Sequence, residues 1–452
     1  MTARALAAFI NDQRVGELRE VAGLWAFQYS QDWLDHPQRF ALSPHLPLTA
    51  QPLADGASAR PVQWYFDNLL PEEAQRTVLA ADAKLDAADA FALLTHYGAE
   101  SAGSLTLLPP KKTPQPAGTL RALSDAKLSE RILKMSAVPL THLAAKRMSL
   151  AGAQHKLAVV MQSGELFEPA GALPSTHILK PDHPRGDYPH SVINEWFVMT
   201  LAQRLGLNVP EVHRRYVPQP VYLVNRFDRQ LQGGGLQGSG LQRNKWRRLH
   251  AIDACQLLGI DRVYKYQGSM DKLATIANAC RSPALARTRL FAWLVFNLLT
   301  GNGDAHLKNL SFMVSDEGVQ LAPHYDLLST ACYDSLAFDR HGWPGQTELA
   351  WPVSGVARFA GLGRGALLDA GGALSIHKTT AARLFGQLHT RIAAAAKGLC
   401  DEVEAANQKL LTERPARANT PAATLAATFA GELRCLRNIV HGIIPEMVAR
   451  LR

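Results

Sequence analysis

The sequence has little cysteine and no long apolar run, and these two absences exclude several classes of protein. Its five cysteines are odd in number, widely spaced and never arranged as CxxC, so neither a disulfide framework nor a zinc site is indicated. No segment approaches the ~18 uninterrupted apolar residues of a membrane span. The apolar run in MTARALAAFINDQR is too short for a secretory signal. We therefore expect a soluble, cytoplasmic protein without a membrane partner.

The size and composition are those of an ordinary globular protein. At 452 residues the chain exceeds what one hydrophobic core usually serves, so two or three packed units are expected. Its 48 Lys and Arg against 39 Asp and Glu give a formal charge of +9, which suits a partner that carries phosphates. The basic residues are spread along the chain, so a merely basic surface is the alternative interpretation.

The N-terminal part predicts a β-meander. AAFINDQRVGELREVAGLWAFQYS alternates apolar and polar residues, with turn signals at Asn11-Asp12 and at Ala22-Gly23. Pro71, followed by two glutamates, predicts the start of a helix. The Pro-rich segment 107–118 predicts a linker.

The middle of the chain predicts three strands, a helix and a further strand. The strands form a hairpin that turns at Ser163-Gly164 and then the segment THILKP; the helix runs from a cap at Ser191 to Gly206, and YLVNRFDR follows. This order resembles the small lobe of a kinase-like fold. Residues 230–245 are rich in glycine and predict a flexible loop, after which apolar residues recur at helical spacing.

The most informative segment is FNLLTGNGDAHLKNLSFM, in which an apolar helix stops, a polar loop follows and an apolar strand resumes. Asp304 and Asn309 have the spacing of the protein-kinase catalytic loop, where the Asp accepts the proton of the substrate hydroxyl and the Asn binds Mg²⁺. His306 and Lys308 lie between them and could steady phosphate oxygens. An ordinary turn rich in Asn, Gly and Asp is the alternative.

A second acidic residue strengthens the prediction of a metal site. Asp326 follows a short apolar run 22 residues beyond Asp304, where the metal-binding aspartate of a kinase would lie. Two carboxylates and an amide around one cation make a hard oxygen site that suits Mg²⁺. By itself, Asp326 could equally be a helix N-cap.

Lys180 and Glu195 predict the ion pair with which kinases fix a phosphate-binding lysine. Lys180 ends an apolar strand, and Glu195 lies on the helix that follows. A surface lysine at a strand end and a glutamate that serves the helix dipole are the alternatives.

The loop LAGAQHK, which precedes the hairpin, predicts contacts with an anion. It has one glycine and is not GxGxxG, but Ala151, Gly152 and Ala153 are small enough for backbone amides to approach an anion, and Lys156 adds charge. Ser149 just before it is placed for modification, or is simply a turn serine.

Together these segments resemble the HipA-type kinases of bacterial toxin–antitoxin modules. The matching segments are, in order, SLAGAQHK, HILKP, the INE helix, NRFDR, GNGDAHLKN and HYDLLS, while FDNLLPE and HYGAESAGSL resemble that family's N-terminal subdomain. The resemblance covers most of the chain. It implies an α+β, atypical protein-kinase-like bilobal fold, with a β-rich N-terminal lobe, an extra N-terminal subdomain and an α-helical C-terminal lobe.

The expected domains are an N-terminal β-rich subdomain, a linker with a helix, a kinase-like N-lobe, a flexible loop and a helical C-lobe, at residues 1–110, 111–140, 141–229, 230–245 and 246–452. The resemblance implies ATP and Mg²⁺ as cofactors, Asp304 as the catalytic base, and Asn309 and Asp326 as metal ligands. The nucleotide-binding residues that it implies are Ala151, Gly152, Ala153, Gln154, His155, Lys156, Lys180, the hinge residues Asn225, Arg226 and Phe227, and His306, Lys308, Asn309 and Tyr325.

The resemblance also implies regulation and partners. Ser149 would be the serine that family members autophosphorylate, which ejects the phosphate loop and silences the enzyme. The substrate would be a protein, such as an aminoacyl-tRNA synthetase. The partner would be a small helix-turn-helix antitoxin of the HipB type, through which the chain would meet operator DNA. His155 and Asn225 stand where the family often has Glu, and neither change removes a catalytic group.

We therefore expect an ATP-dependent serine/threonine protein kinase. The alternatives are a pseudokinase scaffold that binds the antitoxin, and a kinase for small molecules. The intact set of Lys180, Asp304, Asn309 and Asp326 argues against the scaffold, and the N-terminal subdomain argues against the small-molecule kinase.

Overall fold

The structure is a computed structural model. It describes residues 3–115, 118–144, 150–152, 154–232, 245–413 and 422–452. The chain forms two compact units, each made of three segments. The first unit comprises Met1–Lys180, Val224–Tyr264 and Ser311–Ala322, and the second comprises Pro181–Leu223, Lys265–Leu310 and Pro323–Arg452. The contiguous domains predicted from the sequence stay a prediction.

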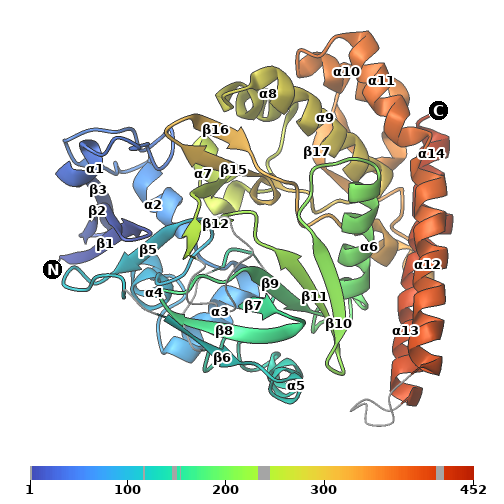
Figure 1. The fold of residues 1–452 in the computed structure, drawn as a ribbon. Coiled ribbons are helices and arrows are strands. Elements are labelled where there is room, and N and C mark those ends of the chain that lie inside the picture. Colours follow the sequence, from blue (N-terminus) through green and yellow to red (C-terminus); the bar gives the residue numbers. More distant parts are fainter. Residues whose placement is uncertain (1–2, 116–117, 145–149, 153, 233–244, 414–421) are drawn as a thin grey trace. The chain divides into compact units, whose positions relative to one another are not determined.

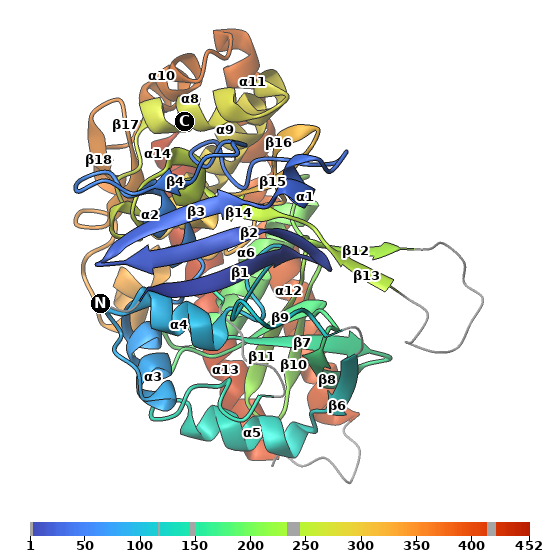
Figure 2. The ribbon, with the colours of Figure 1, turned by 90° about the vertical axis from the view of Figure 1, so that its left-hand side faces the viewer.

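The first unit begins with a five-stranded antiparallel sheet in the order β4-β3-β2-β1-β5. Figure 2 labels the first four of these strands side by side. Its strands are β1 (Arg4–Ile10), β2 (Gln13–Val21), β3 (Leu24–Tyr29), β4 (Leu53–Ala54) and β5 (Leu105–Leu108). The predicted meander is confirmed, and its two turns contain Asn11 and Gly23 at positive φ. Its helices are α1 (Gln31–Leu34), α2 (Pro61–Asp67), α3 (Glu73–Ala83) and α4 (Ala90–Tyr97). Aromatic rings join helices to sheet, with Trp25 edge-on to Phe91 and Phe27 against Phe66.

The predicted start of a helix at Pro71 is wrong by two residues. Helix α3 begins at Glu73, and Pro71 instead forms a parallel β-bridge with Gly152. The proline signal is local, whereas this bridge depends on a segment eighty residues further along the chain.

A second antiparallel sheet of the first unit contains the predicted hairpin and third strand. Four of its strands follow in the order β9-β7-β8-β6. They are β6 (Gly118–Ala122), β7 (Leu157–Gln162), β8 (Glu165–Gly171) and β9 (His177–Pro181), and α5 (Asp125–Lys134) follows β6. The hairpin turns at Ser163 and Gly164, both at positive φ, as predicted.

Short strands complete the first unit: β12 (Arg229–Gln232), β13 (Lys245–Arg248), β14 (Ala251–Asp253), β15 (Ser311–Ser315) and β16 (Gly318–Leu321), with α7 (Ala254–Leu258) and η1 (Arg262–Tyr264). The helical structure predicted directly after the flexible loop is partly wrong in the run AIDACQLLG, because its first three residues form β14. Asp253 begins α7 through a capping box with Gln256, which explains why the helix starts there. The predicted flexible loop lies mostly outside the described residues, and its two described ends pair as β12 and β13.

The second unit is mainly helical and surrounds α9 (Figure 1). Its helices are α6 (Ser191–Arg204), α8 (Met270–Ala279), α9 (Pro283–Leu299), α10 (Arg364–Ala373), α11 (Lys378–His389), α12 (Ile392–Thr412), α13 (Ala422–Asn438) and α14 (Ile444–Arg450). Its strands are β10 (Val212–Tyr216), β17 (Glu348–Val353), β18 (Val356–Arg358) and most of β11 (Pro220–Asn225), whose last two residues belong to the first unit. Single turns are η2 (Leu307–Asn309), η3 (Ala331–Asp334), η4 (Leu336–Phe338), η5 (Phe359–Gly361) and the π-helical η6 (Ile439–Ile443).

The apolar run of α9 explains its central place. Every residue from Trp293 to Leu299 is buried, and α8, α10, α11 and α14 pack around this helix. The predicted helix cap at Ser191 is wrong by one residue: His190 is the N-cap, and Ser191 is the first helical residue. The carboxylate of Asp182 accepts the backbone N–H of Val192 at 2.8 Å, so it performs the capping that the sequence assigned to the serine. Gly206 follows the helix at positive φ, as predicted.

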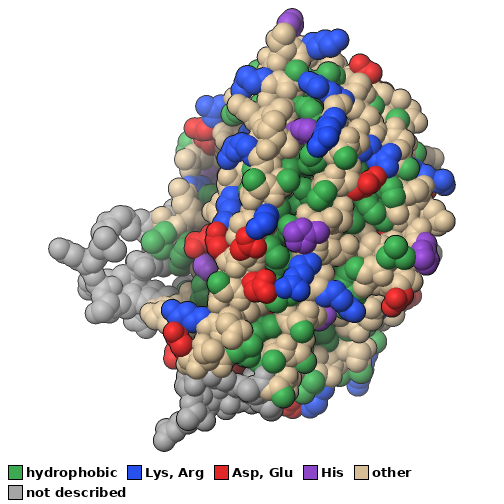
Figure 3. Space-filling view, turned by 90° about the vertical axis from the view of Figure 1, so that its right-hand side faces the viewer, with side chains coloured by type: hydrophobic (Ala, Val, Ile, Leu, Met, Phe, Trp, Pro, Cys, Tyr) green, Lys and Arg blue, Asp and Glu red, His purple; other side chains and the backbone are tan. Residues whose placement is uncertain are grey.

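Two surface properties bear on the expectations from composition. None of the helices in the described residues is both long enough and apolar enough to cross a membrane. On the face that carries α12, basic and acidic side chains are interspersed with apolar ones (Figure 3). This pattern fits the interpretation of the positive charge as a spread-out property of the surface.

A buried glutamate predicts a pH dependence of stability. Glu432 on α13 is 1% exposed; the Tyr216 hydroxyl donates to its Oε2 at 2.8 Å, and Arg214 lies 3.5 Å away. Burial raises the pKa of Glu432 to about 7, although Tyr216 and Arg214 lower it. A raised pKa means that the stability from the protonated form is complete below the unfolded value of about 4.5 and is lost as the pH rises through about 7.

We expect Glu432→Gln to remove this loss. The free energy of unfolding of the variant, relative to that of the wild type, should then rise by on the order of 2–3 kcal/mol from pH 5 to pH 8. The measurement is the free energy of unfolding in urea at the two pH values. Asp182, whose burial raises its pKa to about 6, is present in both proteins; its charge also raises the pKa of Glu432, so the difference between the two proteins includes this coupling. Glu404→Gln, at an exposed glutamate of α12, is the control. A difference between Glu432→Gln and wild type that does not change with pH would contradict the interpretation.

Candidate active site

The catalytic loop starts where α9 ends, and glycine is required at that point. Gly301 has φ of +65°, and a Cβ there would lie 2.6 Å from the Cβ of Ala331 and 2.7 Å from a side-chain carbon of Ile443. Both the backbone conformation and the lack of space therefore exclude a side chain. The chain reverses sharply after α9 and enters the polar loop.

Two asparagines hold the loop in place. The Asn297 amide donates to the Trp293 carbonyl at 2.8 Å, and its Oδ1 accepts the amide of Asn302 at 2.7 Å. Oδ1 of Asn302 accepts the backbone N–H of Asp304 at 3.0 Å. Both asparagines are 2% exposed, so these bonds satisfy groups that would be costly to leave unpaired. A side-chain relay thus fixes the backbone of Asp304 to the buried helix.

Asp304 is half-buried and surrounded by hydrogen-bond donors. Its carbonyl accepts the backbone N–H of His306 at 2.7 Å and the side-chain amide of Asn309 at 2.8 Å, and its Oδ1 accepts the Tyr266 hydroxyl at 2.7 Å. Burial raises the pKa of Asp304, and Asp326 raises it too, while His306, Tyr266 and Lys265 lower it. A general base requires a carboxylate whose pKa is raised from its ordinary value and whose position is fixed, and Asp304 has both properties.

The structure brings Asn309 and Asp326 to the same place as Asp304. The Asn309 amide nitrogen is bonded to the Asp304 carbonyl, which directs its Oδ1 to the opposite side of the group. Asp326 has φ of 59° and interacts electrostatically with Asp304. The Tyr325 hydroxyl donates to the Lys308 carbonyl at 2.8 Å and so joins the two segments. The predicted residues of the second unit, His306 included, therefore form one cluster.

This cluster fits a magnesium site of the kinase type. The described residues contain no group of three His, Cys, Asp or Glu side chains placed to hold a metal. A kinase site needs fewer, because one Asp and one Asn are completed by water and phosphate oxygens. Asn309 and Asp326 supply one amide oxygen and one carboxylate, both hard ligands that suit Mg²⁺. The role of each remains a prediction.

Glu195 is buried on α6 at 4% exposure, as a residue of the predicted ion pair would be. It interacts with the buried hydroxyl of Tyr222, whose pKa is raised by burial and further by Glu195 and Asp326. Glu195 and the predicted metal ligand Asp326 thus both act on the same tyrosine, Tyr222. Its pairing with Lys180 stays a prediction.

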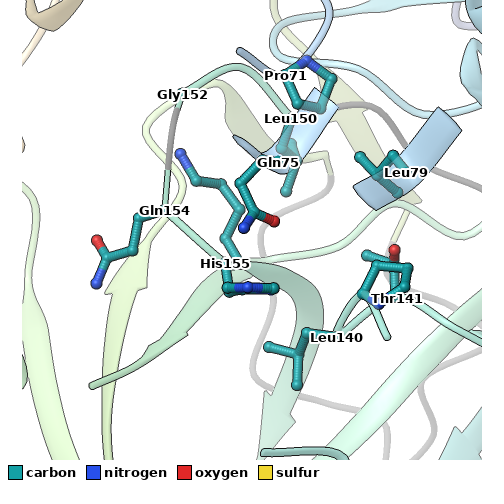
Figure 4. Close-up of a pocket in the computed structure, with 11 residues that line it drawn as sticks. Pro71, Gln75, Leu79, Leu140, Thr141, Leu150, Gly152, Gln154 and His155 are labelled. Carbon is teal, nitrogen blue, oxygen red and sulfur yellow. The ribbon is translucent and has the colours of Figure 1, made fainter. Parts of the chain in front are cut away.

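The predicted phosphate loop belongs to the first unit and borders a small pocket (Figure 4). Gly152 has φ of +111°, and the Lys156 ammonium donates to the Ala151 carbonyl at 2.6 Å across the bend. Gln75 of α3 and His155 of the loop point into the same space, with Gln154 beside them (Figure 4). Glu72 donates its backbone N–H to the Gly152 carbonyl at 3.4 Å. Ser149 and Ala153 lie outside the described residues.

Lys180 lies at the same end of the sheet as Lys156. Strands β7 and β9 are antiparallel, and Leu157 is paired with Leu179. The next pair in that register is Lys156 and Lys180, so the two cations follow the ladder at one end, on neighbouring strands. Lys180 is 7% exposed, and a lysine is rarely this buried unless it is paired. Two lysines at one place suit a polyphosphate.

The RFDR motif, whose first arginine belongs to the predicted hinge, takes part in a buried ion network. Arg226 donates to Asp228 through Nε at 2.9 Å and through Nη2 at 2.6 Å, and Arg229 and Arg248 donate to Glu100 at 3.0 and 2.7 Å. Burial alone raises the pKa of Asp228, but Arg226 and Arg229 lower it to about 2.

Nucleotide binding by Arg226 would therefore use its backbone, because its side chain is engaged in this network. Its backbone N–H already donates to the Thr176 carbonyl at 2.9 Å. Asn225 and Phe227 flank it, at the end of β11 and just beyond. The hinge role of these three residues stays a prediction.

Sequence reasoning missed three features of the site: the tyrosine on Asp304, the asparagine relay and the ion network. The relay left a signal, since Asn297 interrupts the otherwise apolar run LVFNLL and a buried amide in such a run needs partners. Tyr266 left none, because it precedes Asp304 by 38 residues in a segment without a motif.

The similarity to known proteins defines the class of this protein as a serine/threonine protein kinase. The predicted α+β, kinase-like fold class is confirmed. Residues 148–406 match the HipA-like C-terminal domain, and residues 6–108 match the HipA N-terminal domain. The chain belongs to the HipA family.

Individual relatives agree with this assignment. The putative kinase Y4mE of Sinorhizobium fredii is 37% identical over 350 residues, which are 75% of this chain and 80% of the relative. The serine/threonine-protein kinase toxin HipA of Shewanella oneidensis is 32% identical over 351 residues, 73% of this chain and 76% of the relative. A solved complex of Shewanella oneidensis HipA with HipB and operator DNA has a TM-score of 0.72 at 26% identity, covering 98% of this chain and 99% of that chain.

Proposed function

We propose that this kinase transfers the γ-phosphoryl group of ATP to a serine or threonine hydroxyl of a protein, as the toxin of a toxin–antitoxin module. The observation that carries the proposal is that Asp304 and Asn309 lie on one loop fixed by buried side chains, and that Asp326 interacts electrostatically with Asp304. Asp304 would accept the proton of the acceptor hydroxyl. Asn309 and Asp326 would hold Mg²⁺, which offsets the charge of the phosphates when it is bound.

The other predicted residues support binding rather than chemistry. Lys156 and Lys180 share one end of the β7–β9 ladder, and small residues of the loop leave backbone amides accessible to phosphate oxygens. Phosphoryl transfer depends mainly on positioning and on electrostatic stabilisation, with no covalent intermediate on the enzyme. This explains why most of the predicted nucleotide-binding residues are cations or fixed hydrogen-bonding groups.

The partner that we propose is a small helix-turn-helix antitoxin of the HipB type. Support comes from the structural relative, which was solved with HipB and operator DNA. The likeness extends over 98% of this chain, so the surfaces that such a partner would use have counterparts here. Contact with DNA would then come through the antitoxin.

The substrate that we propose is a protein of the translation machinery, such as an aminoacyl-tRNA synthetase, together with Ser149 of the chain itself. Phosphorylation of Ser149 would place two negative charges just before the loop that carries Lys156. The loop is bent tightly at Gly152 and tied by the Lys156 bond to Ala151. A dianion beside it would compete for that lysine, which gives a physical reason for self-silencing.

The experiment that tests the proposal is incubation of unphosphorylated protein with γ-labelled ATP and Mg²⁺, followed by mass mapping of the phosphate. We expect label on Ser149 in the wild type, and none at that site in Ser149→Ala. Dephosphorylation beforehand, checked by intact mass, removes phosphate acquired during expression. Absence of label from protein that is shown to bind ATP would count against the kinase proposal.

A further inference from the structure

Tyr266 places an exposed phenol against the proposed base. Its hydroxyl donates to Oδ1 of Asp304 at 2.7 Å, while 53% of the residue is exposed. A general base must lie within about 2.6–3.2 Å of the group whose proton it accepts. The phenol thus makes with Asp304 the contact that an acceptor hydroxyl has to make, and makes it from the surface side.

The phenol is held there by the catalytic loop itself. Its ring lies edge-on to His306, with ring centroids 5.1 Å apart at 82°. The Lys265 ammonium lies 5.0 Å from the centroid of the same ring. The backbone of Lys265 is joined to the loop, because Leu307 donates its N–H to the Lys265 carbonyl at 3.0 Å. Both the main chain and the ring therefore direct the hydroxyl to Asp304.

Burial does not require this hydrogen bond. An exposed phenol can be solvated by water when it leaves the carboxylate, so breaking the bond strands no buried polar group on the tyrosine. Asp304 is half-buried and gains from having a donor, but any hydroxyl in the same place satisfies it. The contact is therefore both favourable and replaceable, which are the two properties of a competitor for the acceptor position.

We propose that Tyr266 is a gate whose hydroxyl occupies the acceptor position at Asp304, so that a serine or threonine must displace it before phosphoryl transfer. The proposal rests on the proposed function of Asp304 as the base. While the gate is closed, Oδ1 of Asp304 already accepts a hydrogen bond, so water and small hydroxyl compounds have to compete with the phenol for that oxygen. An acceptor that brings further contacts of its own offsets the loss of the tyrosine bond, so the gate favours a docked protein over other hydroxyl donors.

The gate makes a kinetic prediction that separates it from a purely orienting role. The apparent affinity for an acceptor is reduced by the fraction of enzyme in which the gate is open. Removing the hydroxyl therefore lowers the KM for the acceptor and leaves kcat nearly unchanged. A tyrosine that only orients the carboxylate would instead lower kcat when its hydroxyl is removed, with KM unchanged.

The test is Tyr266→Phe in the full chain, which removes the hydroxyl and keeps the ring against His306. The probes are a mixture of synthetic peptides, each with one central serine, and water itself, followed as ATP hydrolysis without peptide. We expect the peptide KM to fall by about three- to tenfold, kcat to stay within about twofold, and ATP hydrolysis to rise by about three- to tenfold. Tyr264→Phe, at an exposed tyrosine two residues earlier, is the matched control.

Each other outcome overturns the gate. An unchanged or higher KM, or a lower kcat, shows that the hydroxyl does not compete with the acceptor. If neither the wild type nor Tyr266→Phe transfers phosphate to peptide or to water, removing the hydroxyl has not made Asp304 available to an acceptor. Asp304→Asn in the same assay separates the two ideas: if it leaves transfer intact, the proposed function fails, whereas an Asp304-dependent enzyme unaffected by Tyr266→Phe loses only the gate.

Discussion

Replacing Asp304 by Asn is expected to reduce phosphoryl transfer by about 10²–10⁴-fold while ATP binding changes by less than about twofold. Asparagine has the shape of aspartate but cannot accept the acceptor's proton. The anchors of residue 304 are main-chain groups: its N–H is bound to Asn302, and its carbonyl accepts from His306 and Asn309. These bonds survive the substitution, so the loss measures the carboxylate and not a collapsed loop.

The measurement is the initial rate of label transfer to Ser149 and to serine peptides, with ATP affinity determined separately by calorimetry. Asp316→Asn is the control, because Asp316 is an exposed residue in the turn between β15 and β16. A variant Asp304→Asn that folds, binds ATP and transfers phosphate at the wild-type rate would show that another group accepts the proton.

The parts of this site that the sequence predicts are those encoded by local spacing. Asp304 and Asn309 are five residues apart, and a loop of that length brings both to one place whatever surrounds it. The hairpin turn at Ser163-Gly164 is equally local, because glycine at positive φ decides the reversal by itself. Function could be inferred from such segments because the chemistry depends on side chains that are neighbours in the chain.

The parts that the sequence does not predict depend on partners far along the chain. Tyr266 reaches Asp304 only because Lys265 is paired with Leu307, a contact that no pattern announces. Pro71 looks like a helix start until Gly152 is available to bridge it. The buried ion network of Arg226 and Arg229 was not predicted, because nothing local reveals that Glu100 lies within reach.

The ion network around Glu100 predicts the largest effect on stability. Glu100 is fully buried, and it accepts from Arg229 at 3.0 Å, from Arg248 at 2.7 Å and from Ser175 at 3.2 Å. Within the network three arginines face two carboxylates, so it already carries an excess positive charge. That imbalance acts with burial to lower the pKa of Arg229 to about 10.

We expect Glu100→Gln to lower the free energy of unfolding by about 3–5 kcal/mol, measured as a lower urea midpoint at unchanged slope. The amide keeps the shape of the side chain but removes one of two negative charges, and buried arginines cannot shed theirs by losing a proton at neutral pH. Glu130→Gln on α5 removes an exposed ion pair with Lys134 and should leave the midpoint unchanged.

Adding Arg248→Met to Glu100→Gln separates charge balance from lost packing. Methionine fills part of the space of the arginine and removes one positive charge. The double variant has therefore lost one cation and one carboxylate, and its excess positive charge equals that of the wild type. If uncompensated charge is the cause, the double variant is more stable than Glu100→Gln alone, although it carries one substitution more. A further loss of stability would show that the hydrogen bonds of Arg248, such as the one to Thr106 at 2.9 Å, matter more than the charge. Glu100 and Thr106 come from the N-terminal segment of the first unit, and the arginines come from the segment after β11. Recovery of stability in the double variant would therefore show that charge balance holds these two segments together.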